Sequence, residues 1–374
     1  MKIKFLLYIS FITCTLLLVS WGSVGHKKIN TNATLSFNQQ MSQFIVWSSQ
    51  LSSHASDADN RKDSDPTEAP KHYIDIDVYQ DFIINKRIAQ TWDSIVMSYG
   101  NAFVLDNGIL PWATITTYDT LRSCFIRKDW PKAILTAADL GHYVADGHMP
   151  LHITQNYNGQ LTGNSGIHSR YESTMIGAYN SQIIYSGDTN ITVIQNVNKY
   201  IFDYIYNNYQ YKDSILAADN FAKLAAGGST SSSTYTFNLW NKTQNFTKLL
   251  FINASQSLAE LIYTAWVEAG SPEYNTTDID EYTNEKDKTS LLIYPNPVIK
   301  STSIKLNLNN ECKSMVLSIF DSKGKTIEII KKGNLSKGNY IFEWIPKDIS
   351  EGIYFCQLKT DSIVKSQKII YLHE

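Results

Sequence analysis

The spacing of apolar residues changes once along the chain, near residue 290. Before that point apolar residues recur every three or four positions, which predicts α-helices that bury one face. The clearest stretches are 132–149, 190–211 and 245–268. Residues 229–235 are rich in Ser and Thr and are expected to form a surface loop. Strand-like alternation is scarce here, so we predict an all-α domain.

From Leu291 onward the apolar pattern has a period of two residues, as in strands with one buried face. Residues 303–308, 314–320 and 340–344 show it, residues 321–324 resemble a hairpin turn, and Gly352 introduces a further strand. This spacing predicts a small β-sandwich of about seven short strands.

Two other segments have a distinct composition. Lys2 and Lys4 precede an apolar run from Phe5 to Val19, which is typical of a secretory signal peptide. Residues 271–290 are polar and without periodicity, as in a linker. The predicted organisation is a signal peptide at 1–20, a helical domain at 21–270, the linker, and the sandwich at 291–374.

Composition narrows the class of protein. The chain has 374 residues, 43% of them hydrophobic, and a net charge of −2 without a polybasic tract, so charge alone indicates no affinity for nucleic acid. Removal of the signal peptide would leave Cys124, Cys312 and Cys356, an odd number that argues against a disulfide scaffold. Cys312 and Cys356 would pair if their strands are neighbours; otherwise they are buried thiols.

Candidate metal ligands gather in two blocks. His142 and Asp146 are four residues apart, and so are His168 and Glu172, while His152 follows two residues after a proline. On a helix, residues at this spacing lie on one face, so each pair can hold one metal ion. Nitrogen and carboxylate ligands together suit zinc. This pattern favours a metal-dependent hydrolase.

These blocks resemble the bacterial zinc-dependent phospholipases C and the related fungal single-strand nucleases. The family pattern is matched by Trp21 and His26, an Asp before His72-Tyr73, the segment from His142 to His152, and His168 with Glu172. The resemblance implies an all-helical domain with about three zinc ions. Its implied ligands are Asp57, His72, His142 and Asp146 for the first ion, His152, His168 and Glu172 for the second, and Trp21, His26 and a shared Asp146 for the third.

Some assignments within this resemblance stay open. Asp57 has the best spacing to His72 and would also align or deprotonate the attacking water, with Asp59 in reserve. Trp21 would bind through the amino group that signal cleavage exposes. Tyr73 is expected to line a headgroup pocket, to stack on a base, or to be part of the core.

The resemblance leaves two substrates in view. The segment from Trp21 to His26 looks like the nucleases, whereas the segment from Gly166 to Glu172 looks like the phospholipases. We expect a secreted zinc-dependent phosphodiesterase that acts through zinc-activated water, with a phospholipid as the first choice and single-stranded nucleic acid or a nucleotide as the alternative. A binding or adhesive protein with structural zinc is the alternative from another class.

The tail resembles the C-terminal sorting domain of type IX secretion. The matching residues are Tyr294-Pro295-Asn296-Pro297, the stretch from Ile319 to Gly324, Gly352 to Tyr354, and a late strand from Lys365 to Ile370. This resemblance implies an interaction with the secretion machinery and a secreted or cell-surface location. No stable protein partner is indicated by the sequence.

Overall fold

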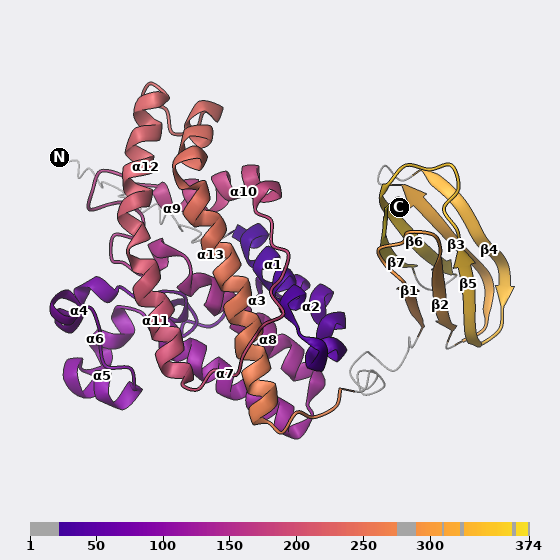
Figure 1. Cartoon of the computed structure of the whole chain (residues 1–374), viewed down its shortest axis with the longest axis horizontal. Coiled ribbons are helices and arrows are strands. Elements are labelled where there is room, and N and C mark those ends of the chain that lie inside the picture. Colours follow the sequence, from indigo (N-terminus) through magenta and orange to yellow (C-terminus); the bar gives the residue numbers. More distant parts are fainter. Residues whose placement is uncertain (1–21, 275–288, 309, 322–324, 361–363, 373–374) are drawn as a thin grey trace, which may run out of the picture. The chain divides into compact units, whose positions relative to one another are not determined.

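The computed structural model describes residues 22–274, 289–308, 310–321, 325–360 and 364–372. The expected signal peptide, Trp21, most of the expected linker and turn residues 322–324 lie outside these ranges. Residue contacts divide the chain into two compact units, 1–274 and 275–374, of which the first is helical and the second is built from strands (Figure 1). This agrees with the predicted fold classes.

The helical unit contains α-helices joined by turns, by 3₁₀ segments and by two longer connections, 153–166 and 183–196. They are α1 (Gly22–Ala33), α2 (Ser48–Ser53), α3 (Asp57–Arg61), α4 (Gln80–Asn85), α5 (Trp92–Tyr99), α6 (Asn101–Asp106), α7 (Leu110–Arg127), α8 (Trp130–Gly147), α9 (Ile167–Ser169), α10 (Ile176–Tyr179), α11 (Val197–Tyr209), α12 (Tyr211–Ala225) and α13 (Ser233–Glu268). The 3₁₀ turns are η1 (Thr34–Ser36), η2 (Gln39–Trp47), η3 (Ala69–His72), η4 (Ile76–Val78), η5 (Pro150–His152) and η7 (Asn180–Gln182), and η6 (Arg170–Met175) is a π-helix.

Helix α8 lies at the centre of this unit. It begins where the side chain of Asp129 accepts the backbone N–H of Lys132, and Pro131 occupies its first turn, where proline costs no hydrogen bond. It ends at Gly147, and Pro150 starts a separate turn. It is in contact with α1, α2, α7, α11 and α13, and every residue from Leu140 to Gly147 is buried. This second half of α8 is therefore a suitable place for a polar site shielded from water.

The longest helix, α13, runs beside α12 and contacts α1, α7 and α8 (Figure 1). It begins at Ser233, within the stretch 229–235 that was expected to form a loop. Ser232 caps the helix by accepting the backbone N–H of Tyr235, so the second half of the expected loop is helical. The predicted helix 190–211 begins only at Val197, after the cap Asn196. In both places a polar residue sets the helix start.

The second unit consists of two antiparallel sheets, in the strand orders β1-β2-β5 and β4-β3-β6-β7. The strands are β1 (Ser290–Tyr294), β2 (Thr302–Leu308), β3 (Cys312–Asp321), β4 (Thr326–Leu335), β5 (Gly338–Trp344), β6 (Gly352–Thr360) and β7 (Val364–Tyr371). Ile304 and Trp344 of one sheet share a core with Leu317 and Leu358 of the other, which confirms the predicted sandwich.

None of the three described cysteines forms a disulfide. Cys124, Cys312 and Cys356 are all buried and free. The strands of Cys312 and Cys356 are neighbours, but Cys356 stands opposite Ile319 and Cys312 stands opposite Leu335 of the other flanking strand. The residues therefore face different partners across the sheet.

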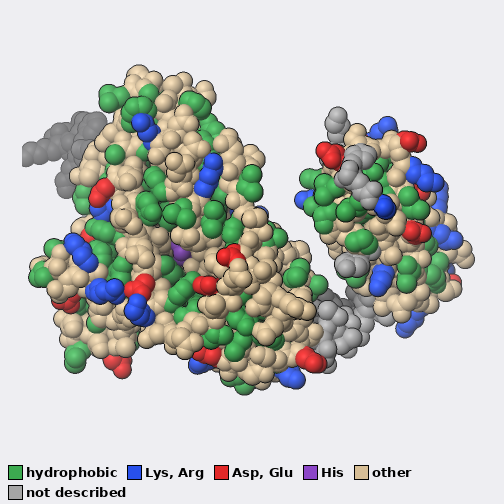
Figure 2. Space-filling model, viewed as in Figure 1, with side chains coloured by type: hydrophobic (Ala, Val, Ile, Leu, Met, Phe, Trp, Pro, Cys, Tyr) green, Lys and Arg blue, Asp and Glu red, His purple; other side chains and the backbone are tan. Residues whose placement is uncertain are grey.

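The surface of the helical unit has no single-sign character on the face that Figure 2 shows, where Lys and Arg are interspersed with Asp and Glu. None of the described helices combines the length and the apolar character needed to span a bilayer.

Candidate metal centre

The centre of the candidate site is a pair of side chains one turn apart on α8. His142 and Asp146 are both 0% exposed. The neighbouring Gly141 allows α1 to lie close, because a Cβ there would be 2.1 Å from Oδ1 of Asn30. This close approach brings the ring of His26 onto the ring of His142, with centroids 3.8 Å apart.

A first cluster consists of Asp59 of α3, His72 of η3, and the two α8 residues His142 and Asp146. Nδ1 of His72 lies 3.0 Å from Oδ2 of Asp146 and 3.6 Å from Oδ1 of Asp59. Nε2 of His142 lies 3.4 Å and 3.5 Å from the same two oxygens, and 3.0 Å from Nδ1 of His72. The four atoms come from three separate segments of the chain.

These separations match a tetrahedral metal site. Zinc binds nitrogen and carboxylate oxygen at about 2.0–2.2 Å, which places neighbouring ligand atoms of a tetrahedron about 3.3–3.6 Å apart. Three of the five separations in the first cluster, 3.4 to 3.6 Å, lie in this range, and the other two are 3.0 Å. An ion would fit among these atoms with little rearrangement.

Asp146 also belongs to a third cluster, with His26 and His142. Its Oδ1 lies 3.6 Å from Nε2 of His26, whereas its Oδ2 faces His72. The carboxylate thus turns one oxygen to each of two neighbouring groups, as a bridging ligand does. Trp21, the remaining expected member, lies outside the described residues but directly precedes α1, which carries His26.

A second cluster consists of His152, His168 and Glu172. His152 lies on η5, His168 on α9 and Glu172 on the π-helix η6. Nε2 of His168 is 2.6 Å from Oε2 of Glu172, and Nε2 of His152 is 3.7 Å from Oε1. A π-helical turn within a helix is uncommon and is frequent at functional sites.

Hydrogen bonds to carbonyl groups orient the imidazoles. Nδ1 of His142 donates to Ala55 (2.8 Å), Nδ1 of His152 donates to the carbonyl of His72 (2.7 Å), and Nδ1 of His168 donates to Tyr157 (3.2 Å). Because a carbonyl only accepts, the proton resides on Nδ1 and Nε2 is left to bind a cation. Such an outer hydrogen bond is typical of histidines that ligate metals.

The hydrogen bonding of the second cluster also supports a metal ion there. Among the described residues, neither carboxylate oxygen of Glu172 accepts a hydrogen bond, and Nε2 of His152 has no hydrogen-bond partner. All three atoms are buried, although two imidazole nitrogens face the carboxylate. Acceptors that converge out of contact with water require a positive charge between them. A metal ion, or an additional proton on an imidazole, would supply it.

The pKa values in the first cluster show a similar requirement for a positive charge. Burial by itself would raise the pKa of the carboxyls of Asp59 and Asp146, but His142 reverses the effect and holds both pKa values below their usual range. Burial lowers the pKa of His142, yet Asp146 and Asp59 raise it to about 10. Without metal, therefore, a proton on His142 balances the carboxylates, and metal binding would displace it.

The pKa of His26 is shifted in the opposite direction from that of His142. Burial and the neighbouring His142 hold its pKa well below the usual value, so its imidazole is neutral at physiological pH. A neutral imidazole is the form that coordinates a metal ion.

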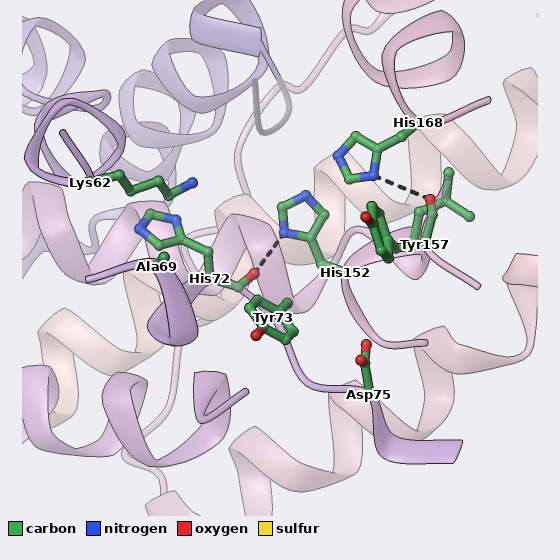
Figure 3. Close-up of a pocket in the computed structure, with 9 residues that line it drawn as sticks. Lys62, Ala69, His72, Tyr73, Asp75, His152, Tyr157 and His168 are labelled. Carbon is green, nitrogen blue, oxygen red and sulfur yellow. Dashed lines mark hydrogen bonds between the residues drawn. The ribbon is translucent and has the colours of Figure 1, made fainter. Parts of the chain in front are cut away.

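The first and second clusters border one cavity of about 220 Å³ (Figure 3). Its walls are formed by residues from η3, η5, α9 and the segments between them, namely Lys62, Ala69, His72, Tyr73, Asp75, Leu151, His152, Tyr157 and His168. The ring of Tyr157 is exposed, so the cavity reaches the surface there. A ligand entering this cavity would meet the imidazole ligands of both clusters.

The structure places the two candidate acids Asp57 and Asp59 differently. Oδ2 of Asp57 lies 2.6 Å from Nδ1 of His54 at the surface, and Asp57 belongs to none of the metal-ligand groups among the described residues. Asp59, two residues later, takes the expected place beside His72 and His142. The helix α3 begins at Asp57, and over two residues its side chains rotate by about 200°, so only one of the two acids can face α8.

Tyr73 lines the cavity, as one of its three expected roles requires. Sequence reasoning missed Lys62, Asp75 and Tyr157 on the same walls, and no periodic signal marks them. It also missed Glu68, a buried carboxylate 3.5 Å from Nε2 of His72. The spacing of four residues between Glu68 and His72 was the signal available.

His148, at the end of α8, belongs to none of the metal-ligand groups among the described residues. Its Nδ1 donates to the carbonyl of Val144, its ring stacks on Tyr204, and burial lowers its pKa to about 4. It is a neutral core histidine.

Among known proteins, a family model matches the second unit, whereas solved structures match most of the chain. Residues 292–372 match the family model described as a secretion system C-terminal sorting domain. The type IX sorting assignment from the tail motifs is confirmed by this match. The chain is therefore secreted or attached to the cell surface.

No curated protein matches the chain in sequence. Among solved structures, the alpha toxin of Clostridium absonum is 11% identical with a TM-score of 0.44, covering 92% of this chain and 94% of its own. The alpha-toxin of Clostridium perfringens, from an avian strain, is also 11% identical, with a TM-score of 0.43 and coverage of 94% and 97%. Similarity at this level identifies no activity, so the function has to be inferred from the site.

Proposed function

We propose that the helical unit is a zinc-dependent phosphodiesterase of the phospholipase C type. One observation supports this most directly: Asp146 faces His72 with one oxygen and His26 with the other, and the imidazoles of His72, His152 and His168 line the cavity. Shared carboxylates beside an open cavity are typical of catalytic metal sites, whereas structural zinc sites are closed by four protein ligands.

The proposed ligand sets follow the clusters. Asp59, His72, His142 and Asp146 hold the first ion, and His152, His168 and Glu172 hold the second. The third ion is held by His26 and Asp146, together with the amino group and carbonyl of Trp21. The second cluster has only three protein ligands, which leaves a coordination position for water or substrate.

Bound zinc acidifies a coordinated water and neutralises charge on phosphate oxygens. The side chains have complementary roles. Asp59 takes over the water-orienting role that the resemblance implied for Asp57, because it is the carboxylate of the first cluster that contacts Lys62, whose ammonium is 2.7 Å from Oδ1. Lys62 places a positive charge on the cavity wall near the position of the phosphate.

A phospholipid is the preferred substrate. Single-stranded nucleic acid carries a phosphate on each side of the scissile bond, and binding it usually depends on a basic groove. The cavity instead presents one lysine, Lys62, and an acid, Asp75. Nucleic acid is therefore the alternative that the assay must exclude, and structural zinc is the other.

The test combines metal analysis with two substrates. The purified protein should contain about three zinc ions, and hydrolyse phosphatidylethanolamine or phosphatidylcholine vesicles but not single-stranded DNA. A chelator should abolish turnover and zinc should restore it. His142→Ala should remove activity, while the matched control His54→Ala, at the surface beside Asp57, should not. Hydrolysis of DNA alone would establish the nuclease alternative, and bound zinc without hydrolysis of either substrate would favour a structural role.

A further inference from the structure

One carboxylate on the cavity wall has no partner among the residues that the structure describes. The backbone of Asp75 is fixed, since its N–H donates to Asn107 (2.8 Å) and its carbonyl accepts from Val78 (3.1 Å). Its side chain, in contrast, makes no hydrogen bond or ion pair with any residue that the structure describes, although it lines the cavity. Figure 3 shows the carboxylate directed toward the side of the cavity where Tyr157 lies.

The neighbouring acid Asp77, in contrast, has hydrogen-bond partners. It accepts hydrogen bonds from Oγ1 of Thr154 (2.5 Å) and from the backbone N–H of Gln155 (2.9 Å), and so holds the segment that leads to Tyr157. Burial and the nearby Asp77 raise the pKa of Asp75 to about 7. A partly desolvated carboxylate beside a second acid is stabilised in its charged form by a cation.

Two tyrosines flank the same wall. The hydroxyl of Tyr73 donates to the carbonyl of Asp106 (3.3 Å), and Gly108 packs so closely that a Cβ there would be 2.6 Å from its ring. The ring of Tyr73 is thereby fixed. The exposed ring of Tyr157 meets His168 edge-on, with centroids 6.1 Å apart. Aromatic rings beside a carboxylate provide a favourable environment for an organic cation.

We infer that Asp75, Tyr73 and Tyr157 form a subsite for the ammonium group of an amine-bearing phospholipid headgroup, and that a primary ammonium is preferred to a quaternary one. This inference rests on the proposed function. A primary ammonium donates charge-assisted hydrogen bonds to the unpartnered carboxylate, whereas a quaternary ammonium has no N–H to donate. A headgroup without a cation leaves the carboxylate unpaired, which disfavours its binding.

The experiment compares kcat and KM on vesicles of phosphatidylethanolamine, phosphatidylcholine and phosphatidylglycerol. The wild-type protein should prefer the three in that order, with roughly tenfold in kcat/KM between the first and the last, the value of one charge-assisted hydrogen bond. Asp75→Asn should abolish this preference through KM, with zinc content unchanged. Asp106→Asn removes an equal charge from an exposed position nearby and should keep the preference.

Tyr157→Leu gives a second, independent variant, since its exposed side chain is not needed for folding. It should weaken binding of both amine headgroups relative to phosphatidylglycerol. The inference is overturned if Asp75→Asn retains the preference, if it loses zinc, or if the wild-type protein does not distinguish the headgroups. If the zinc-loaded protein hydrolyses none of the three lipids, the proposed function itself fails.

Discussion

Oδ2 of Asp146 lies 3.0 Å from Nδ1 of His72, although 74 positions separate the two residues in the chain. The other oxygen of Asp146 faces His26. One carboxylate therefore joins three segments: α1, η3 and α8.

The first prediction concerns this shared position. Asp146→Asn should lower the zinc content by about two ions, because it weakens two clusters, and should reduce turnover more than about a hundredfold. Glu172→Gln, which affects the second cluster alone, should cost about one ion. Elemental analysis with a turnover assay distinguishes them. Equal zinc contents in the two variants would show that Asp146 does not bridge.

The second prediction separates the two acids of α3. Asp59→Asn should reduce zinc content and turnover, since its carboxylate lies 3.5 Å from Nε2 of His142. Asp57→Asn should remain close to wild type, because the Asp57 side chain pairs with His54 and both side chains are partly exposed to water. Kinetics and zinc analysis of the two variants provide the measurement. The reverse outcome would restore the ligand expected from the sequence.

The third prediction concerns stability around the second cluster. Arg170 donates to Asp219, Tyr235 and two backbone carbonyls, and Asp219 is fully buried. Arg170→Gln should lower the free energy of unfolding by about 1.5–3 kcal/mol, because it removes a charge-assisted hydrogen bond from the buried Asp219, which keeps its ion pair with Lys223. Arg122→Gln removes a surface pair with Glu268 and should cost less than about 1 kcal/mol. Denaturant titration measures both changes, and similar values would contradict the prediction.

The fourth prediction concerns the boundary between the units. Tyr274 is buried against Phe44, Trp47 and Trp130, and its backbone N–H donates to Gln43 (2.6 Å). A chain that ends after Tyr274 should fold, bind zinc and retain hydrolysis. A chain that ends at residue 270 should have a lower melting temperature, because it lacks this aromatic contact.

The same two truncations test the sorting domain. Both lack residues 292–372, which match the sorting model, so neither should reach the cell surface of the native host. Fractionation of cells that express the longer truncation provides the measurement. Surface delivery of the truncated protein would show that the tail is not the export signal.

The fifth prediction concerns the amino terminus. Trp21 directly precedes α1, whose His26 lies 3.6 Å from Asp146. A protein that retains a Met before Trp21 should lose about one zinc ion, because an amide nitrogen does not ligate as an amine does. Sequencing of the mature protein should begin at Trp21. Unchanged zinc content in the extended protein would exclude the amino group as a ligand.

Much of the architecture could be predicted from the sequence, because helices and strands impose a regular spacing on nearby apolar residues. The spacing of four between His142 and Asp146, and again between His168 and Glu172, already implied two ligand pairs, since one helical turn brings such residues together. The alternation after Leu291 implied the sandwich in the same way. Helix starts were harder to predict. Ser232 caps a helix within a stretch that resembled a loop, and Asn196 caps one within a stretch that resembled a continuous helix.

Tertiary packing decided the rest. Asp57 and Asp59 are nearly equivalent in spacing to His72, and only the placement of α3 against α8 selects Asp59. The free carboxylate of Asp75 was likewise not evident, because whether a side chain has a partner depends on every segment packed around it. Local periodicity follows from backbone geometry, which is the same in every chain. The choice among nearby polar residues depends on contacts between segments far apart in sequence, as with the 74 positions that separate His72 from Asp146.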